Sequence, residues 1–303
     1  MTSAVRVAEL RDIEIVGPRD APVVAVLGGI SSSRHVTASP ADPSPGWWGD
    51  FVGPDKTIDT NQFRVASIDY NVSANGLRCA SAWDHAAALA RALDNEGIER
   101  IRGIVGASYG GTVALAFCAL EPERADRLIV YGAAHESAPI ATAHRILQRK
   151  VVELGLRAGY GREALVIARG LAVTTYSTAR DFADRFRAVD PGERCDAIDE
   201  RLAEAGERFA EQMTPERFLD LSRSLDTDWV DPARIRTATT LIGVVEDALV
   251  PLSQLRALAN LIGPACTLEI VSSRHGHDAF LNDTASIAPI VSRALKTPLA
   301  IVP

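Results

Sequence analysis

The sequence predicts an α/β fold in which a mostly parallel, doubly wound sheet is interrupted by a block of helices. Short runs of β-branched and other apolar residues recur along the chain, and such runs are typical of strands buried on both faces of a sheet. Segments with helical spacing of apolar residues lie between these runs, which is the order that right-handed βαβ units require. In the middle of the chain the alternation gives way to consecutive helical patterns.

Six apolar runs are expected to form the parallel strands. They comprise residues 23–27, 63–68, 101–105, 128–131, 240–245 and 267–271. Four segments with helical spacing should pack against the sheet, and they comprise residues 82–95, 111–120, 252–261 and 285–295. Because helices cover both faces of such a sheet, both sides of each strand should be buried.

Residues 135–229 are expected to form an inserted helical lid. Five successive segments in this part of the chain carry apolar residues at steps of three and four, as amphipathic helices do. The α/β core would then consist of residues 1–134 and 230–303. The chain shows no internal repeat that would indicate a solenoid or an array.

Composition and charge exclude several classes of partner. The 303 residues include 39 acidic and 32 basic side chains, a net charge of -7 that argues against a nucleic-acid-binding surface. The N-terminal residues lack the pattern of a signal peptide, and no apolar run is long enough to span a bilayer, so a cytoplasmic protein without a membrane partner is expected. Neither a metal site nor a disulfide is expected, because four cysteines are far apart and form no metal-binding pattern: Cys79, Cys118, Cys195 and Cys266.

The stretch GIVGASYGGT, residues 103–112, places Ser108 in a Gly-x-Ser-x-Gly pattern between a predicted strand and a predicted helix. In that context the serine sits on a sharp turn that lifts its hydroxyl above the edge of the sheet, where a nucleophile is needed. The alternative is a tight turn whose serine only caps the following helix. The strand and helix on either side favour the nucleophile.

A nucleophilic serine needs a histidine base and a carboxylate that orients it, in the chain order serine, acid, histidine. His277, in SSRHGHDAF after the last predicted strand, is the preferred base, with His275 as its rival. Asp247 lies at the carboxyl end of the preceding strand, on the ligand-binding edge of a parallel sheet. Glu246 is the alternative acid, because neighbouring strand residues face opposite sides. The predicted triad is Ser108, Asp247 and His277.

Acyl transfer also needs an oxyanion hole, which in this chemistry comes from two backbone N–H groups. One belongs to the residue after the nucleophile, here Tyr109. The other should come from the loop LGGISSS after an early strand, where Gly28, Gly29 and Ile30 are candidates and the last two are preferred. A simple turn is the alternative explanation of the two glycines.

Several segments together point to a known family. They read GWWGDFVGPDKTIDTNQFRV, GASYGG, LAVTTYSTARDFADRF, FLDLSRSLDTDW, VVEDALVP and GHDAFL. In this order they resemble the signatures of the homoserine O-acyltransferase family of the α/β-hydrolase superfamily, with GHDAFL the most specific. The resemblance implies acylation of L-homoserine from acetyl-CoA or succinyl-CoA in methionine biosynthesis, without a bound cofactor. It also implies a homodimer through the inserted helices, where the apolar face of residues 145–156 could serve as the interface or could pack on the core.

The resemblance further implies three substrate contacts. Arg169 matches an arginine on an inserted helix that holds the carboxylate of the amino acid, and Tyr176 matches a tyrosine on the same segment. Asp278, directly after His277, matches an aspartate that meets the substrate amine. A guanidinium suits a carboxylate, and a carboxylate suits an ammonium group. A solvated charge for Arg169 and a helix cap for Asp278 are the alternatives.

Departures from the family pattern leave the acyl donor open. Ala107 and Tyr109 stand where the family usually has glycine and methionine, and the segment 69–76 is shorter than the family's glycine-rich loop. A succinyl donor would need a cation for its distal carboxylate, and Arg34, Arg78 and Arg145 are candidates between which the sequence does not choose. Serine in place of homoserine as the acceptor also stays open.

The expected mechanism is ping-pong transfer through an acyl-enzyme on the serine. The alternative enzyme is a serine esterase or thioesterase of the same fold. A small-molecule-binding protein without activity is a third possibility, because one fold hosts many functions.

Overall fold

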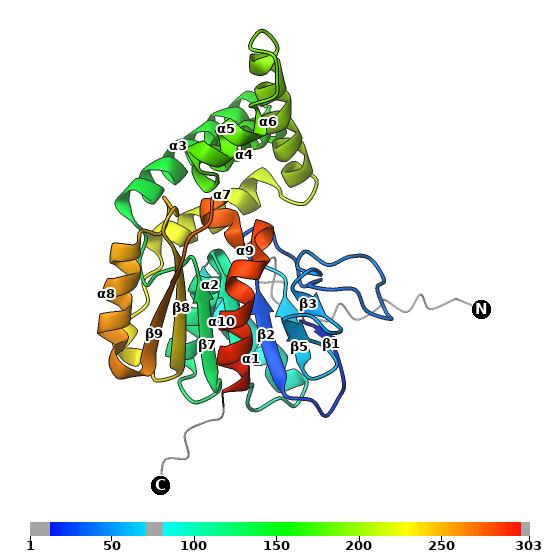
Figure 1. Ribbon diagram of the computed structural model, residues 1–303, viewed down its shortest axis with the longest axis vertical. Helices are drawn as coiled ribbons and strands as arrows, with labels where there is room; N and C mark the ends of the chain where they lie inside the picture. Colours follow the sequence, from blue (N-terminus) through cyan, green and yellow to red (C-terminus); the bar gives the residue numbers. More distant parts are fainter. Residues whose placement is uncertain (1–12, 71–80, 298–303) are drawn as a thin grey trace, which may run out of the picture.

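A seven-stranded sheet forms the centre of the protein, whose structure is a computed structural model that describes residues 13–70 and 81–297 (Figure 1). The strands lie in the order β1-β5-β2-β6-β7-β8-β9. Strand β1 pairs antiparallel with β5, and all other neighbours pair in parallel. The strands comprise β1 (Ile13–Val16), β2 (Val23–Leu27), β5 (Arg64–Ile68), β6 (Gly103–Ala107), β7 (Arg127–Tyr131), β8 (Ala238–Val244) and β9 (Cys266–Val271). This topology confirms the predicted fold class.

Helices cover both faces of the sheet, as the apolar strands require. Along β2, Ala25 and Leu27 belong to the same apolar cluster as the buried faces of α1, α2 and α8, whereas Val24 and Val26 belong to the cluster that includes α10. All four of these side chains are completely buried. The helices of this layered core comprise α1 (Ala82–Asn95), α2 (Tyr109–Leu120), α8 (Leu252–Ile262), α9 (Ala279–Asn282) and α10 (Thr284–Lys296).

Five more helices occupy the chain between β7 and β8. Figure 1 shows α3 to α6 as a lobe above the carboxyl ends of the parallel strands, with α7 between this lobe and the sheet. Gly159 caps the C-terminus of α3, and its φ of +82° is the left-handed conformation that commonly terminates a helix. The helices comprise α3 (Pro139–Ala158), α4 (Gly161–Tyr176), α5 (Ala179–Arg185), α6 (Arg194–Ala210) and α7 (Pro215–Thr227).

All six predicted strands exist, and β2 has the predicted bounds, whereas the bounds of the other five differ. The prediction that residues 101–105 form a strand is shifted, because β6 runs over Gly103–Ala107 and Ile101 forms only an isolated bridge with Ala125. No sequence pattern predicts the edge strand β1. The same is true of β3 (Val52–Gly53) and β4 (Ile58–Asp59), which form a separate small sheet. The last two are too short to show any periodicity.

Candidate active site

Ser108 occupies a strained turn between β6 and α2. Its backbone has φ 53° and ψ -120°, a conformation that residues other than glycine rarely adopt. The Ser108 N–H donates to the carbonyl of Tyr131 at 2.9 Å, which ties the turn to the neighbouring strand β7. The Ser108 side chain makes no capping hydrogen bond to α2. The geometry therefore matches a nucleophile elbow and not a helix cap.

The two glycines of the motif are required by close packing of the backbone. A Cβ atom on Gly106 would lie 2.3 Å from the carbonyl oxygen of Gly110. A Cβ atom on Gly110 would lie 2.4 Å from the carbonyl oxygen of Leu27, at the end of β2. Neither contact can be relieved by moving a flexible side chain, because both partners are backbone atoms. The Gly-x-Ser-x-Gly pattern is thus a steric requirement of this turn.

Replacing Gly110 with alanine is expected to destabilise the fold by roughly 2 kcal/mol or more, because the added carbon overpacks a rigid backbone contact. Thermal unfolding should show a melting temperature lowered by several degrees. Gly170→Ala is the matched control, because a Cβ atom in the middle of α4 meets its nearest neighbour at an ordinary 3.5 Å. That variant should be neutral or slightly more stable. Equal melting temperatures for the two variants would contradict this steric account.

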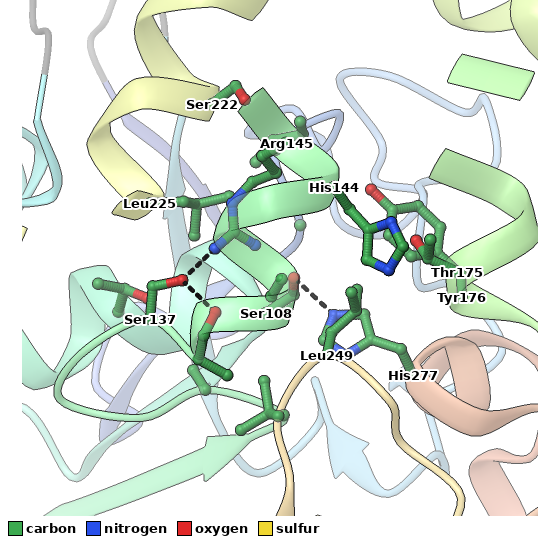
Figure 2. Close-up of a pocket in the computed structure, with 18 of the residues that line it drawn as sticks. Ser108, Ser137, His144, Arg145, Thr175, Tyr176, Ser222, Leu225, Leu249 and His277 are labelled. Atoms are coloured by element: carbon green, nitrogen blue, oxygen red, sulfur yellow. Dashed lines mark hydrogen bonds between the residues drawn. The ribbon is translucent and has the colours of Figure 1, made fainter. Parts of the chain in front are cut away.

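The structure brings the three predicted triad residues together. His277 Nε2 lies 2.9 Å from Ser108 Oγ, and His277 Nδ1 lies 2.8 Å from Asp247 Oδ2 (Figure 2 shows the serine–histidine pair). The other carboxylate oxygen of Asp247 accepts the backbone N–H groups of Leu249 and Val250 at 2.8 and 3.0 Å. These two bonds fix the carboxylate, which in turn fixes the imidazole. Such an arrangement can take the proton of the serine hydroxyl.

The rival residues have other partners. His275 Nδ1 lies 3.3 Å from the buried carboxylate of Asp181, at the start of α5. Glu246 accepts hydrogen bonds from the hydroxyl of Ser272 at 2.5 Å and from the backbone N–H of Ser273 at 2.8 Å. These contacts hold the loop that carries His277 in place. Asp247 is then the carboxylate that hydrogen-bonds to His277. The structure thereby decides both choices that the sequence left open, His277 over His275 as the base and Asp247 over Glu246 as the acid.

Electrostatics prepare His277 to accept a proton. Burial by itself would lower the pKa of His277, but the charge and hydrogen bond of Asp247, together with the charge of Asp278, raise it above its ordinary value. The pKa of Asp278 is also raised, because burial outweighs the favourable charges of His277 and Arg169. A buried base with a raised pKa binds the proton of a serine more readily, as general base catalysis requires.

The candidate oxyanion donors surround Ser108. Tyr109 is the first residue of α2, so its N–H has no acceptor within the helix. Gly29 and Ile30 line the same cavity as Ser108. Gly28 has a different task, because its carbonyl accepts the N–H of Gly110 and the hydroxyl of Tyr70, each at 2.8 Å. The loop after β2 is therefore anchored to α2 beside the nucleophile, with Gly29 and Ile30 facing the cavity.

The side chain of Tyr109 points away from this cavity into a buried polar network that the sequence did not reveal. Its hydroxyl lies 2.9 Å from His85 Nδ1 and 3.2 Å from Ser224 Oγ, which connects α2 with α1 and α7. Burial and the charge of Arg217 lower the pKa of His85 to about 4, so this imidazole is neutral at physiological pH. The tyrosine thus replaces the usual family methionine without entering the reaction cavity.

The three substrate contacts implied by the family resemblance lie around the same cavity. Arg169, Tyr176 and Asp278 all line it, together with Ser108 and His277. The Arg169 guanidinium lies 5.1 Å from the ring centroid of Tyr176, whose ring in turn lies 5.7 Å from that of His277. Among the described residues, no carboxylate lies within 4 Å of the Arg169 nitrogens. A cation and an anion therefore face a common space beside the nucleophile.

The cavity has a further wall that no sequence pattern indicates. It is formed by the start of α3 and by α7, and Figure 2 shows Arg145 pointing from α3 into the space that Ser108 and His277 also face. Arg34 does not line the cavity, and its Nε atom lies 3.6 Å from Asp69 Oδ2. Arg78 lies outside the described residues. Polar residues of the missed wall include Ser137, His144, Gln148 and Ser222.

The described part of the chain has neither a metal-binding cluster nor a helix that could cross a membrane. Residues 13–70 and 81–297 hold no group of three or more histidine, cysteine or acidic side chains arranged to bind a metal ion. No helix in these ranges combines the length and apolar character that crossing a bilayer requires. Cys118, Cys195 and Cys266 are free thiols, and Cys79 lies outside the described residues.

Known proteins resemble this chain over most of its length. The family profile for the alpha/beta hydrolase fold matches residues 32–159. A homoserine O-succinyltransferase of Xanthomonas campestris pv. campestris is 37% identical over 289 residues, covering 94% of this chain and 78% of the relative. An L-serine/homoserine O-acetyltransferase of Streptomyces lavendulae is 32% identical, covering 90% of this chain and 87% of the relative.

Solved structures share the fold but differ in function. A homoserine O-acetyltransferase from Bacillus anthracis superposes with a TM-score of 0.82 at 17% identity, covering 95% of this chain and 92% of the other. Esterase E22 superposes with a TM-score of 0.81 at 19% identity, covering 94% and 93%. Similarity at this level shows the fold alone, and the fold accommodates both a transferase and an esterase. The relatives of higher identity decide the family: this chain belongs to the homoserine O-acyltransferase family of the α/β-hydrolase superfamily.

Proposed function

We propose that this protein transfers an acyl group from an acyl-CoA thioester to the hydroxyl of L-homoserine, in methionine biosynthesis. One observation carries the proposal: the cavity that holds Ser108 and His277 is also lined by Arg169 and Asp278. An amino acid has a carboxylate for the guanidinium and an ammonium group for the carboxylate. A simple ester offers neither charge. The relatives named for homoserine and serine acylation support the same assignment.

The proposed reaction has two halves that share one base. Ser108 gives its proton to His277 Nε2 and attacks the thioester carbonyl, while the N–H group of Tyr109 and that of Gly29 or Ile30 supply hydrogen bonds to the oxyanion. The carbon–sulfur bond breaks, and the coenzyme A thiolate leaves with the proton from His277. The homoserine hydroxyl then gives its proton to His277 and attacks the acyl-serine. Ser108 recovers that proton as the O-acyl product forms.

Transfer requires that water be kept from the acyl-enzyme, and we assign this task to the inserted helices. Residues of α3, α4 and α7 line the cavity opposite the triad. Without such a lid the same triad would make a thioesterase, which is the second candidate function because esterase E22 shares this fold. The two candidates differ in whether turnover depends on an amino-acid acceptor and on Arg169.

Free thiol release from acetyl-CoA and succinyl-CoA, measured with and without L-homoserine or L-serine, separates the two functions. The proposal predicts release that depends on the amino acid, with an O-acyl amino acid identified by mass. It also predicts that Arg169→Met raises the KM for the amino acid by about 10- to 100-fold, the loss expected for a hydrogen-bonded charge pair. Release at the same rate without any acceptor, and indifferent to Arg169, would establish the thioesterase.

The pH dependence of kcat/KM should reflect the ionisation of the His277 imidazole. The base must be neutral to accept the serine proton, so activity is lost as the pH falls through its pKa. Because the pKa of His277 is raised above its ordinary 6.5, the acidic limb of the profile should have its midpoint above 6.5. A rate that stays constant from neutral pH to well below 6.5 would contradict the environment described for His277.

We also propose that the protein is a cytoplasmic homodimer. Acyl-CoA thioesters and free amino acids are cytoplasmic metabolites, which is the basis for the location. Large apolar side chains are exposed on the inserted helices α3 and α4, and burial of such side chains between two chains favours association. They include Ile140, Leu147, Leu154, Ile167 and Leu171. Light scattering on a size-exclusion column should give twice the mass of one chain, and a single-chain mass would exclude the dimer.

A further inference from the structure

One corner of the cavity carries more positive than negative charge. The buried carboxylate of Asp226, on α7, is shared by two arginines of α3. Arg145 reaches Asp226 Oδ1 with Nε at 2.8 Å and with Nη2 at 2.6 Å, and Arg149 Nη1 reaches Oδ2 at 2.5 Å. Two guanidinium groups are always charged, whereas one carboxylate supplies a single negative charge. The cluster therefore keeps one positive charge without a counterion.

Of the two arginines in this cluster, Arg145 exposes its positive charge to the cavity. Arg149 does not line the cavity, because it also donates to the carbonyl and the hydroxyl of Ser222. Arg145 does line it, and Figure 2 shows its guanidinium beside Ser137, with which it forms a hydrogen bond. Among the described residues, its Nη1 atom has no hydrogen-bond partner. A planar guanidinium held in this way presents a free donor edge to a ligand.

The surroundings of Arg145 suit an anion. Gln148, one turn further along α3, is only 5% exposed, lines the cavity, and makes no side-chain hydrogen bond to any described residue. Of the acidic residues nearby, Asp228 is turned toward the N–H of Ala82 at 2.6 Å, and the side chain of Glu136 is 57% exposed. The positive charge of Arg145 also acts to lower the pKa of His277, which places the guanidinium near the reacting centre.

The amino-acid acceptor does not account for this second arginine. Arg169 lies on α4 and contacts the rings of Tyr176 and Phe209, apart from the α3–α7 cluster. In the proposed function the single carboxylate of homoserine binds Arg169, so Arg145 remains for the other reactant. An acetyl group is neutral and would leave the positive charge of Arg145 without a counterion. An acyl group that carries its own carboxylate would neutralise this charge.

We infer that Arg145 binds the distal carboxylate of the acyl group, and that the donor is the CoA thioester of a short dicarboxylic acid, succinyl-CoA in the simplest case. This inference rests on the proposed acyltransferase function and adds the donor class and its specificity residue. Of the three arginines that the sequence left open, it prefers Arg145 to Arg34, which lies off the cavity, whereas Arg78 lies outside the described residues. Succinyl and butyryl groups have the same carbon chain, so only the carboxylate distinguishes them.

The test compares donors in the wild-type protein and in Arg145→Met. We expect wild-type kcat/KM to be at least about 10-fold higher with succinyl-CoA than with butyryl-CoA or acetyl-CoA, each with saturating L-homoserine. The variant should lose about 10- to 100-fold with succinyl-CoA and change little with the neutral donors, as removal of a charged hydrogen bond predicts. Arg149 still neutralises Asp226 in this variant, so the fold should be retained.

Arg34→Met is the matched control, and its donor preference should equal that of the wild type. A wild-type enzyme that uses butyryl-CoA or acetyl-CoA as well as succinyl-CoA would overturn the inference, and this comparison needs no variant. An unchanged donor ratio in folded Arg145→Met, or a changed one in Arg34→Met, would overturn it as well. In each of these cases transfer to homoserine still occurs and the proposed function stands. Failure of every donor to acylate any amino acid would instead refute the proposed function.

Discussion

Replacing Ser108 with alanine is expected to lower kcat for acyl transfer by about 10⁴- to 10⁶-fold, the loss seen when a triad nucleophile is removed. The expectation rests on the strained backbone at φ 53° and on the 2.9 Å contact between Ser108 Oγ and His277 Nε2. Initial rates of coenzyme A release in the presence of L-homoserine provide the measurement. The residual rate should not respond to the acceptor, because no acyl-enzyme can form.

The fold of this variant should be intact, because Ser108 is held by backbone contacts. Its N–H bond to Tyr131 and the hydrogen bond from Gly111 N–H to its carbonyl do not involve the hydroxyl. Alanine must adopt the same positive φ, a cost already present with serine. A melting temperature close to that of the wild type therefore accompanies the lost activity. Transfer at more than about one hundredth of the wild-type rate would show that the nucleophile lies elsewhere.

Replacing His277 with alanine should lower kcat by at least about 10⁴-fold, since both proton transfers pass through its imidazole. His275→Ala is a close control on the same loop. His275 Nδ1 lies 3.3 Å from Asp181 of α5, and His275 forms no hydrogen bond with Ser108 or Asp247 in the described structure. This variant should keep a kcat within roughly 10-fold of the wild type, since it perturbs only the support of the loop.

Comparing kcat of the two histidine variants under identical conditions shows which histidine is the general base. A loss in His275→Ala as large as that in His277→Ala, with both proteins folded, would mean that the loop needs both residues for its position. A larger loss in His275→Ala would assign the base to His275 and contradict the geometry of the triad. Circular dichroism and thermal melting establish that each variant is folded.

The layered core was predictable because its strands and helices carry local patterns. Runs such as VVAVL are apolar on both faces, and β2 is completely buried between two layers. Bounds were less predictable where glycine intervenes, as in β6, which continues through Gly106 toward the elbow. The strand β1 was missed because only one of its four residues is buried, so its sequence does not stand out.

The triad was predictable because each member follows a recognisable strand. Ser108 comes directly after β6, Asp247 follows β8 and His277 follows β9, so the carboxyl edge of the sheet collects them. Choosing between neighbours required the structure. Which of two adjacent carboxylates or two nearby histidines turns inward depends on the loop conformation, here set by the contacts of Glu246 and His275.

The cationic corner was not predictable, because its partners are far apart in the chain. Arg145 and Asp226 are 81 positions apart, and α3 and α7 meet only once the inserted helices have folded back over the sheet. The same holds for the network around Tyr109, which joins His85 of α1 to Ser224 of α7. Contacts of this kind depend on how helices pack, and helical periodicity alone does not specify that packing.

The most direct test of the account is the mass of the protein during a half-reaction. The enzyme is mixed with an acyl-CoA donor without an amino acid, its intact mass is recorded, and L-homoserine is then added. The account predicts one acyl group per chain, located on the peptide that contains Ser108, slow loss of this group to water and rapid transfer to form O-acyl-homoserine. An adduct that water removes as fast as homoserine does would contradict the account, as would turnover to the same product in Ser108→Ala.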